Sequence, residues 1–209
     1  MMKIYIVRHG ETQWNTERRM QGWGNSDLTK LGIHQAKQLG KSLANINFDK
    51  VITSPLGRAI ETTKLIVGDR DLDVVVNENF KEMGFGPWEG ENPNVLKEQY
   101  PDQYYNFWHQ AHHYGTIEGG ESFAGVQKRI AKGMKHILDT YGDNPDSKIL
   151  LVTHGMIIKL ILLSIKGLPL ERLWDSSVVH ASSLTVIEVD QDQNMKVVVE
   201  NDVGHLGEL

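Results

Sequence analysis

Short apolar runs alternate with longer stretches in which apolar residues recur every three or four positions. The short runs are rich in Val, Ile and Leu, a pattern typical of buried strands. They predict six strands, at residues 3–7, 51–52, 74–76, 148–153, 184–189 and 196–200. The last two flank the polar segment 190–194, which predicts a hairpin.

The longer stretches have the helical period and begin or end at capping residues. They predict helices over residues 29–43, 57–67, 122–141 and 156–165. Thr29 and Ser122 are suited to accept free backbone N–H groups at helix starts, and Gly68 is suited to end a helix. The apolar face of the first helix is expected to contain Leu31, Ala36, Leu39 and Leu43.

Strands that alternate with helices predict an α/β fold, here a three-layer α/β/α architecture with a mostly parallel central sheet. The nearly continuous apolar strands fit a sheet that is buried on both faces. The chain has 209 residues. At roughly 100–200 residues per domain, this length favours a single domain, residues 1–209.

Residues 84–120 differ in composition from the rest of the chain, because Gly and Pro are frequent and aromatic residues cluster between them. The cluster comprises Tyr100, Tyr104, Tyr105, Phe107, Trp108 and Tyr114. We predict an inserted cap over about 84–120, partly helical around 94–112. The aromatic residues are expected to form its core, and they could also form an apolar wall beside a ligand.

Composition narrows the function classes. Apolar residues make up 40% and charged residues 23%, as in ordinary soluble domains. The net charge of −5, without a basic stripe, argues against a nucleic-acid partner. The start of the chain becomes polar too early for a signal peptide, and the apolar run 156–165 is too short to span a bilayer. We therefore expect a cytoplasmic protein with no membrane partner, and no oligomeric state is predicted.

The chain has no cysteine and nine histidines. Disulfides, thiolate metal sites and cysteine nucleophiles are therefore excluded. Unusual chemistry is expected from histidine, whose charge changes near neutral pH.

Two predicted strands end in the same way, one at Arg8-His9-Gly10 and the other at His154-Gly155. Ligand sites of parallel sheets gather outside the carboxyl ends of the strands, so these histidines are expected to be neighbours. A third strand end leads to Arg58. Four groups that can carry positive charge then surround one point, an arrangement that is costly without an anion.

A phosphoryl group fits this pocket, because each of two arginines can offer two N–H groups to its oxygens. Backbone N–H groups after Gly155 would add donors. Histidine can act as the nucleophile that forms a covalent intermediate. Glu82, in an apolar setting, is the predicted general acid, with Glu78 and Glu89 as alternatives. No metal-ligand set is evident and no cofactor is predicted, since the arginines supply positive charge.

The order of motifs along the chain resembles the histidine phosphatase superfamily, which includes cofactor-dependent phosphoglycerate mutases and many phosphatases. The matching motifs are Arg8-His9-Gly10-Glu11-Thr12, Trp14-Asn15, Met20-Gln21-Gly22-Trp23, Asp27-Leu28-Thr29, Leu31-Gly32, Thr53-Ser54-Pro55-Leu56-Gly57-Arg58-Ala59 and Thr153-His154-Gly155. A lone Arg-His-Gly is a weak signal, whereas this ordered set covers essentially the whole chain.

The resemblance implies a role for each matching residue. His9 corresponds to the phosphorylated nucleophile and Glu82 to the proton donor that later activates water. Catalytic and phosphate-binding roles are implied for Arg8, Arg58 and His154. Contacts with substrate are implied for Asn15, Gln21, Gly22 and Gly155.

The resemblance also favours one branch of the superfamily. Mutases usually carry an added cap segment, a closing C-terminal tail and a small hydroxyl residue where this chain has Gln21. The cap motifs 107–111 and 119–122 are similar to bacterial broad-specificity phosphatases. We predict a metal-independent phosphatase for a small phosphorylated metabolite. The alternatives are a phosphoglycerate mutase and, in another class, a catalytically silent phospho-ligand binding module.

Several residues have plainer interpretations. Asn15 is also suited to cap a helix, and Arg58 could be a surface charge. His109 and His113 lie four residues apart, as two metal ligands on one helix would. We favour the simpler interpretation that His109, His112 and His113 line the cap.

Overall fold

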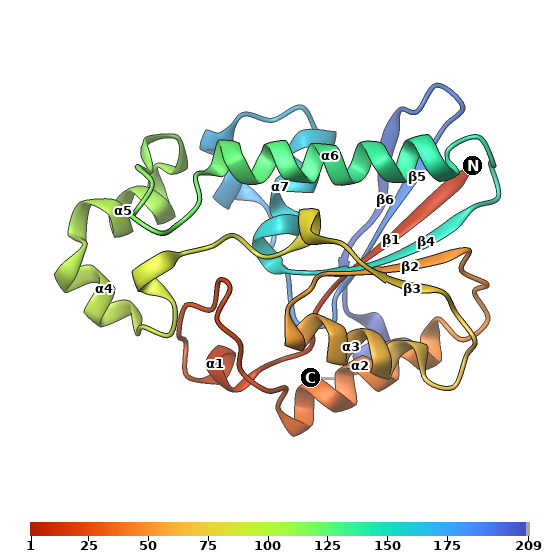
Figure 1. The fold of residues 1–209 in the computed structure, drawn as a ribbon, viewed down its shortest axis with the longest axis horizontal. Coiled ribbons are helices and arrows are strands. Elements are labelled where there is room, and N and C mark those ends of the chain that lie inside the picture. Colours follow the sequence, from red (N-terminus) through yellow and green to blue (C-terminus); the bar gives the residue numbers. More distant parts are fainter. Residues whose placement is uncertain (208–209) are drawn as a thin grey trace.

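The computed structural model describes residues 1–207 and contains one six-stranded sheet between helices (Figure 1). Its strands are β1 (Met2–Arg8), β2 (Lys50–Thr53), β3 (Val74–Val76), β4 (Lys148–Thr153), β5 (Leu184–Val189) and β6 (Met195–Asp202). All six predicted strands are confirmed, with ends that differ by a few residues. The predicted hairpin is the antiparallel pair of β5 and β6.

The strand order is β3-β2-β4-β1-β5-β6. The first four strands are parallel, and β5 and β6 add an antiparallel edge. The predicted mostly parallel sheet is confirmed. Arg8 on β1 pairs with Thr153 on β4 as the last residues of their ladder. His9 and His154 therefore leave the sheet side by side.

Helices cover both faces of the sheet, which confirms the three-layer architecture (Figure 1). They are α1 (Gln13–Thr16), α2 (Lys30–Ser42), α3 (Gly57–Val67), α4 (Pro93–Gln99), α5 (Pro101–His109), α6 (Phe123–Tyr141) and α7 (Gly155–Ile165). The α2 and α3 helices pack on one face, and α6 and α7 pack on the other. The Thr29 and Ser122 side chains accept backbone N–H groups at the starts of α2 and α6, as predicted.

The predicted apolar face of α2 is wrong at Leu31, which is 48% exposed. The first turn of α2 instead packs Gly32 against the backbone of the loop that follows β1. A side chain at Gly10 would place its Cβ 2.7 Å from the Gly32 carbonyl oxygen. This close approach fixes the loop that carries His9, and it leaves Leu31 on the solvent side.

We call residues 84–120 the cap segment. Its two ends are joined by an antiparallel bridge between Phe85 and Gly120. The α4 and α5 helices of this segment project beyond one side of the sheet (Figure 1). Trp88 is fully buried at the centre, and the rings of Tyr100, Tyr104, Phe107 and Tyr114 lie within 6.0 Å of its ring. The predicted aromatic core is therefore present, except that Tyr105 is 53% exposed.

The short 3-10 helices also shape the molecule. They are Glu78–Phe80, Gly86–Trp88, Ala111–His113, Leu170–Asp175 and Gly204–Leu206. The fourth brings Trp174 onto the cap segment, where its Nε1 donates to the carbonyl of Phe107 at 2.6 Å. Within residues 1–207, no helix has the length and apolarity needed to cross a membrane.

Candidate active site

A cavity of about 420 Å³ lies at the carboxyl edge of the parallel strands. Eight of the nine predicted site residues line it: Arg8, His9, Asn15, Gln21, Gly22, Arg58, Glu82 and Gly155. His154 is the exception, because it is fully buried beside His9, with ring centroids 5.2 Å apart. The structure therefore brings the predicted residues together, with His154 packed against the cavity-lining histidine.

The hydrogen bonds of His9 indicate its tautomer. Nδ1 lies 2.8 Å from the carbonyl oxygen of Gly10, which can only accept, so Nδ1 carries the proton. Arg58 Nε donates to Nε2 at 3.3 Å, which requires a lone pair there. Burial, together with the charges of Arg58 and Arg8, holds the His9 pKa well below 6.5. A neutral imidazole with an available Nε2 lone pair is a competent nucleophile.

The two arginines supply the positive charge of the cavity. Arg58 donates to the carbonyls of Gly24 and Gly22, both at 2.7 Å, and so holds the loop beside the cavity. Arg8 Nη1 donates to Val179 at 2.6 Å, whereas its buried Nε has no partner among the described residues. Burial lowers the pKa of Arg58 to about 10, so this guanidinium remains charged at neutral pH. The unpaired N–H of Arg8, which lies beside the charged Arg58, is therefore suited to donate a hydrogen bond to an anionic ligand.

His154 occupies the N-cap position of α7. Its Nε2 lies 2.6 Å from Ser54 Oγ, and its buried Nδ1 has no partner in the described chain. Burial, followed by the charge of Arg58, lowers the pKa of His154 well below 6.5. His154 is therefore neutral at neutral pH, and the positive charge beside the cavity comes from the arginines.

Among the three candidate acids, only Glu82 lines the cavity. Its carboxylate accepts from Met83 N at 2.9 Å and from Met156 N at 3.3 Å. Burial raises the Glu82 pKa, which favours the protonated acid, although these hydrogen bonds oppose the shift. Glu89 instead binds three backbone N–H groups of neighbouring loops. The Glu78 side chain is 74% exposed.

Asn15 takes part in a helix cap, one of its predicted roles, and also lines the cavity. Its Oδ1 accepts from the backbone and the hydroxyl of Thr12 at 3.1 Å, which completes a capping box at α1. The side chain also lines the cavity, and the N–H groups of its Nδ2 are left to donate hydrogen bonds. Gln21 presents a buried Oε1 without a partner in the described residues. Gly22 has φ +52°, a conformation that favours glycine.

Sequence reasoning missed part of the outer wall. Trp174 and Lys159 both line the cavity, and the Trp174 ring packs against that of Trp108 at a tilt, with centroids 4.5 Å apart. No local pattern marks Trp174, which lies outside the cap segment. Lys159 could have been found as the lone cation in the otherwise apolar helix α7. Its Nζ donates to Ser176 Oγ at 2.8 Å.

His109 and His113 do not lie on one helix, as two metal ligands four residues apart would. The α5 helix ends at His109, and His113 belongs to the next 3-10 helix. The His109 ring packs on Tyr105, with centroids 4.8 Å apart. In the described part of the chain, no three His, Asp or Glu side chains are grouped so that they could hold a metal ion.

The fold and the paired strand-end histidines with two arginines define a phosphoryl-transfer enzyme of the histidine phosphatase type. Residues 4–202 match the family described as the histidine phosphatase superfamily (branch 1), and the chain belongs to it. The family predicted from the motifs is thus confirmed.

Some of the similar proteins are named as phosphatases and others as mutases. YhfR of Bacillus stearothermophilus has a similar structure, with a TM-score of 0.93, 36% identity, and 99% and 100% of the two chains covered. A structure described as a putative α-ribazole-5′-P phosphatase from Escherichia coli has a TM-score of 0.86 and 28% identity, with 97% of each chain covered. A probable phosphoglycerate mutase, GpmB of Cronobacter sakazakii, is 35% identical over 81% of this chain and 77% of its own length.

Proposed function

We propose that this protein is a metal-independent phosphatase that hydrolyses small phosphomonoesters through a phosphohistidine on His9. One observation carries the proposal. The neutral His9 lines a cavity with two charged arginines, and the same cavity is lined by a carboxyl group whose pKa is raised. The arginines supply the charge stabilisation that a metal ion provides in other phosphoryl-transfer sites.

In the first step, Arg8 and Arg58 bind the phosphoryl oxygens of the substrate. The Nε2 lone pair of His9 attacks phosphorus, and the bond from phosphorus to the ester oxygen breaks. The leaving oxygen takes the proton of Glu82, so an alcohol leaves and Glu82 becomes a carboxylate. Arg58 Nε donates to His9 Nε2 in the structure, and it transfers this hydrogen bond to a phosphoryl oxygen so that the Nε2 lone pair can attack.

In the second step, water attacks the phosphorus of phosphohistidine. The Glu82 carboxylate accepts a proton from this water, and the bond between His9 Nε2 and phosphorus breaks. Inorganic phosphate leaves, and both residues return to their starting protonation states. The cavity of about 420 Å³ has room for water beside the departing alcohol, since a water occupies roughly 30 Å³.

The second candidate is a mutase, and the name of the Cronobacter sakazakii relative favours it. A mutase would return the phosphoryl group to another hydroxyl, which requires that water be kept from phosphohistidine. The similar structure described as a phosphatase supports hydrolysis. The two functions differ in their product, which is free phosphate for one and an isomerised ester for the other.

The test is a phosphomonoester panel, including 3-phosphoglycerate, assayed for both products with and without EDTA. We expect inorganic phosphate from several esters, at rates that EDTA does not change. The His9→Ala variant should release almost none. Loss of activity in EDTA, full activity in His9→Ala, or 2-phosphoglycerate as the main product would overturn the proposal. Phosphate binding without turnover would instead indicate a binding module.

A further inference from the structure

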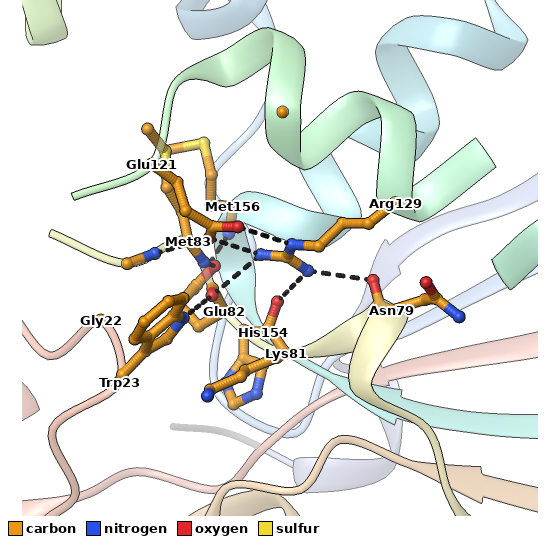
Figure 2. A network of polar contacts seen from close by, with 12 residues as sticks. Gly22, Trp23, Asn79, Lys81, Glu82, Met83, Glu121, Arg129, His154 and Met156 are labelled. Carbon is orange, nitrogen blue, oxygen red and sulfur yellow. Dashed lines mark hydrogen bonds and ion pairs between the residues drawn. The ribbon is translucent and has the colours of Figure 1, made fainter. Parts of the chain in front are cut away.

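Arg129 on α6 is the centre of a polar network behind Glu82 (Figure 2). Its guanidinium donates twice to the Glu121 carboxylate, at 3.0 and 2.9 Å. It also donates to three backbone carbonyls, those of Asn79, Lys81 and Glu82, at 3.0, 2.6 and 3.0 Å. A guanidinium has five N–H donors, so the partners match its full capacity.

Glu121 extends the same network to the other side of Glu82. Its Oε2 accepts from the backbone N–H of Gly84 at 2.9 Å as well as from Arg129. The pair therefore holds the main chain from residue 79 to residue 84. The Glu82 carbonyl accepts a second hydrogen bond, from Trp23 Nε1 at 2.8 Å.

This segment depends on such contacts, because residues 81–84 lie outside the helices and strands. Its side-chain end is fixed differently: the Glu82 carboxylate accepts from Met156 N at the start of α7. Arg129 thus fixes the backbone from α6, whereas α7 fixes the carboxylate. Among the described residues, the side chain of Arg129 donates hydrogen bonds to four residues: Glu121, Asn79, Lys81 and Glu82. It is not among the residues that line the cavity.

We propose that Arg129, paired with Glu121, is a positioning residue that aims the general acid Glu82 at the leaving oxygen; this rests on the proposed phosphatase function. Charge-assisted hydrogen bonds to carbonyls are strong and geometrically specific. A misplacement of about 1 Å at a reacting group can cost about 10²-fold in rate. Release of the segment would therefore impair protonation of the leaving group before it impairs phosphate binding.

The leaving group provides a readout that a merely structural role would not change. An alkoxide is a poor leaving group and needs the proton of Glu82, whereas p-nitrophenolate leaves without it. Impaired positioning should therefore lower kcat/KM, which reports only the steps up to release of the alcohol, far more for glycerol phosphate than for p-nitrophenyl phosphate. General instability would lower both equally.

The experiment compares Arg129→Lys and Glu121→Gln with wild type on these two substrates. For Arg129→Lys, we expect the ratio of the alkyl to the aryl kcat/KM to fall by about 10²-fold. Glu121→Gln keeps an acceptor for Gly84 but weakens the ion pair, so its ratio should fall less. Lys135→Ala, which removes an exposed ion pair with Asp139 on the same helix, should leave the ratio unchanged.

Glu82→Gln separates the failure of this inference from failure of the proposed function. If Glu82→Gln lowers the ratio but neither other variant does, the positioning role is wrong and the phosphatase mechanism stands. If Glu82→Gln leaves the ratio unchanged, or if wild type releases no phosphate, the proposed function itself fails. Equal losses on both substrates in Arg129→Lys would also overturn the inference. If that variant does not fold, the ratio measured in Glu121→Gln decides.

Discussion

Hydrogen bonds and charge fix the side chains at the carboxyl edge of the sheet, whereas ring packing fixes those of the cap segment. His9 and Arg58 are held by main-chain carbonyls and by each other. In the cap segment, Phe107 is fully buried and packs against the rings of Trp88 and Tyr114. Directional bonds define a position for chemistry, while packed rings define the shape of a wall. We therefore expect reaction type and substrate preference to be separable by mutation.

The largest effect should come from removing the nucleophile at the sheet edge. His9→Ala should lower kcat by about 10⁴-fold or more, because loss of a nucleophile removes the whole covalent route. The cap segment should be unaffected, so thermal unfolding and the near-ultraviolet spectrum of its aromatic residues should match wild type. Substantial remaining phosphate release, with the fold intact, would break the assignment of chemistry to this edge.

Glu82→Gln should lower kcat for alkyl phosphates by about 10²- to 10⁴-fold, the usual contribution of a general acid. The substitution keeps the size of the side chain but removes its transferable proton. KM should change little, since the arginines bind the phosphoryl group. An unchanged kcat would transfer the acid role to another group, and Glu89→Gln serves as the matched control.

The pH profile gives a second test of the same pair. Activity requires neutral His9 and protonated Glu82. The pKa of His9 lies well below 6.5, so activity should decrease on the acid side of the profile only below that pH. The pKa of Glu82 is raised by burial, so activity on alkyl phosphates should persist above pH 4.5 and be lost as pH rises through the shifted value. Glu82→Gln should abolish this alkaline limb. If the limb persists in that variant, it belongs to another group.

In the cap segment, the largest expected effect is on stability. Phe107→Ala should lower the free energy of unfolding by about 3–5 kcal/mol, because it leaves a cavity among packed rings. Tyr105→Ala on the same helix is the matched control. Tyr105 is 53% exposed, and its loss should cost no more than about 0.5 kcal/mol. Similar unfolding midpoints for the two variants would contradict the packed core.

The smallest effect should appear at the cavity wall. Trp174→Ala should raise KM for aryl phosphates by about tenfold, equal to about 1.4 kcal/mol, because an aromatic contact is lost. The KM for small alkyl phosphates and the kcat for either class should change little. Steady-state kinetics on both substrates would check this. An equal rise in KM for both would mean that the tryptophan shapes the phosphate site itself.

The meeting of the two histidines could be predicted, because a local sequence pattern there follows a general rule of parallel sheets. Buried strands that end at His9 and His154 predict convergence, because parallel strands share a carboxyl edge. The side-by-side departure of these residues from β1 and β4 follows from that rule. The lowered pKa of His154 could not be predicted, since its full burial beside Arg58 depends on packing that no motif encodes.

The outer wall and the support of Glu82 were less predictable. Trp174 reaches the cap segment from a 3-10 helix more than sixty residues further along the chain. Arg129 has an ordinary place on an amphipathic helix, and only the tertiary path of residues 79–82 gives it three backbone carbonyls to bind. Long-range packing of this kind has no periodic signature in one sequence.

The most direct test of the account is to find the phosphoryl group on His9 during turnover. Wild type and Glu82→Gln would be quenched at alkaline pH while hydrolysing p-nitrophenyl phosphate in EDTA, then digested with trypsin. Cleavage after Arg8 and Arg18 gives peptide 9–18, in which His9 is the only histidine. The account predicts one acid-labile phosphoryl group on this peptide, more abundant in Glu82→Gln. Two results would contradict it: phosphate release while peptide 9–18 stays unmodified, or a phosphoryl group found on another residue.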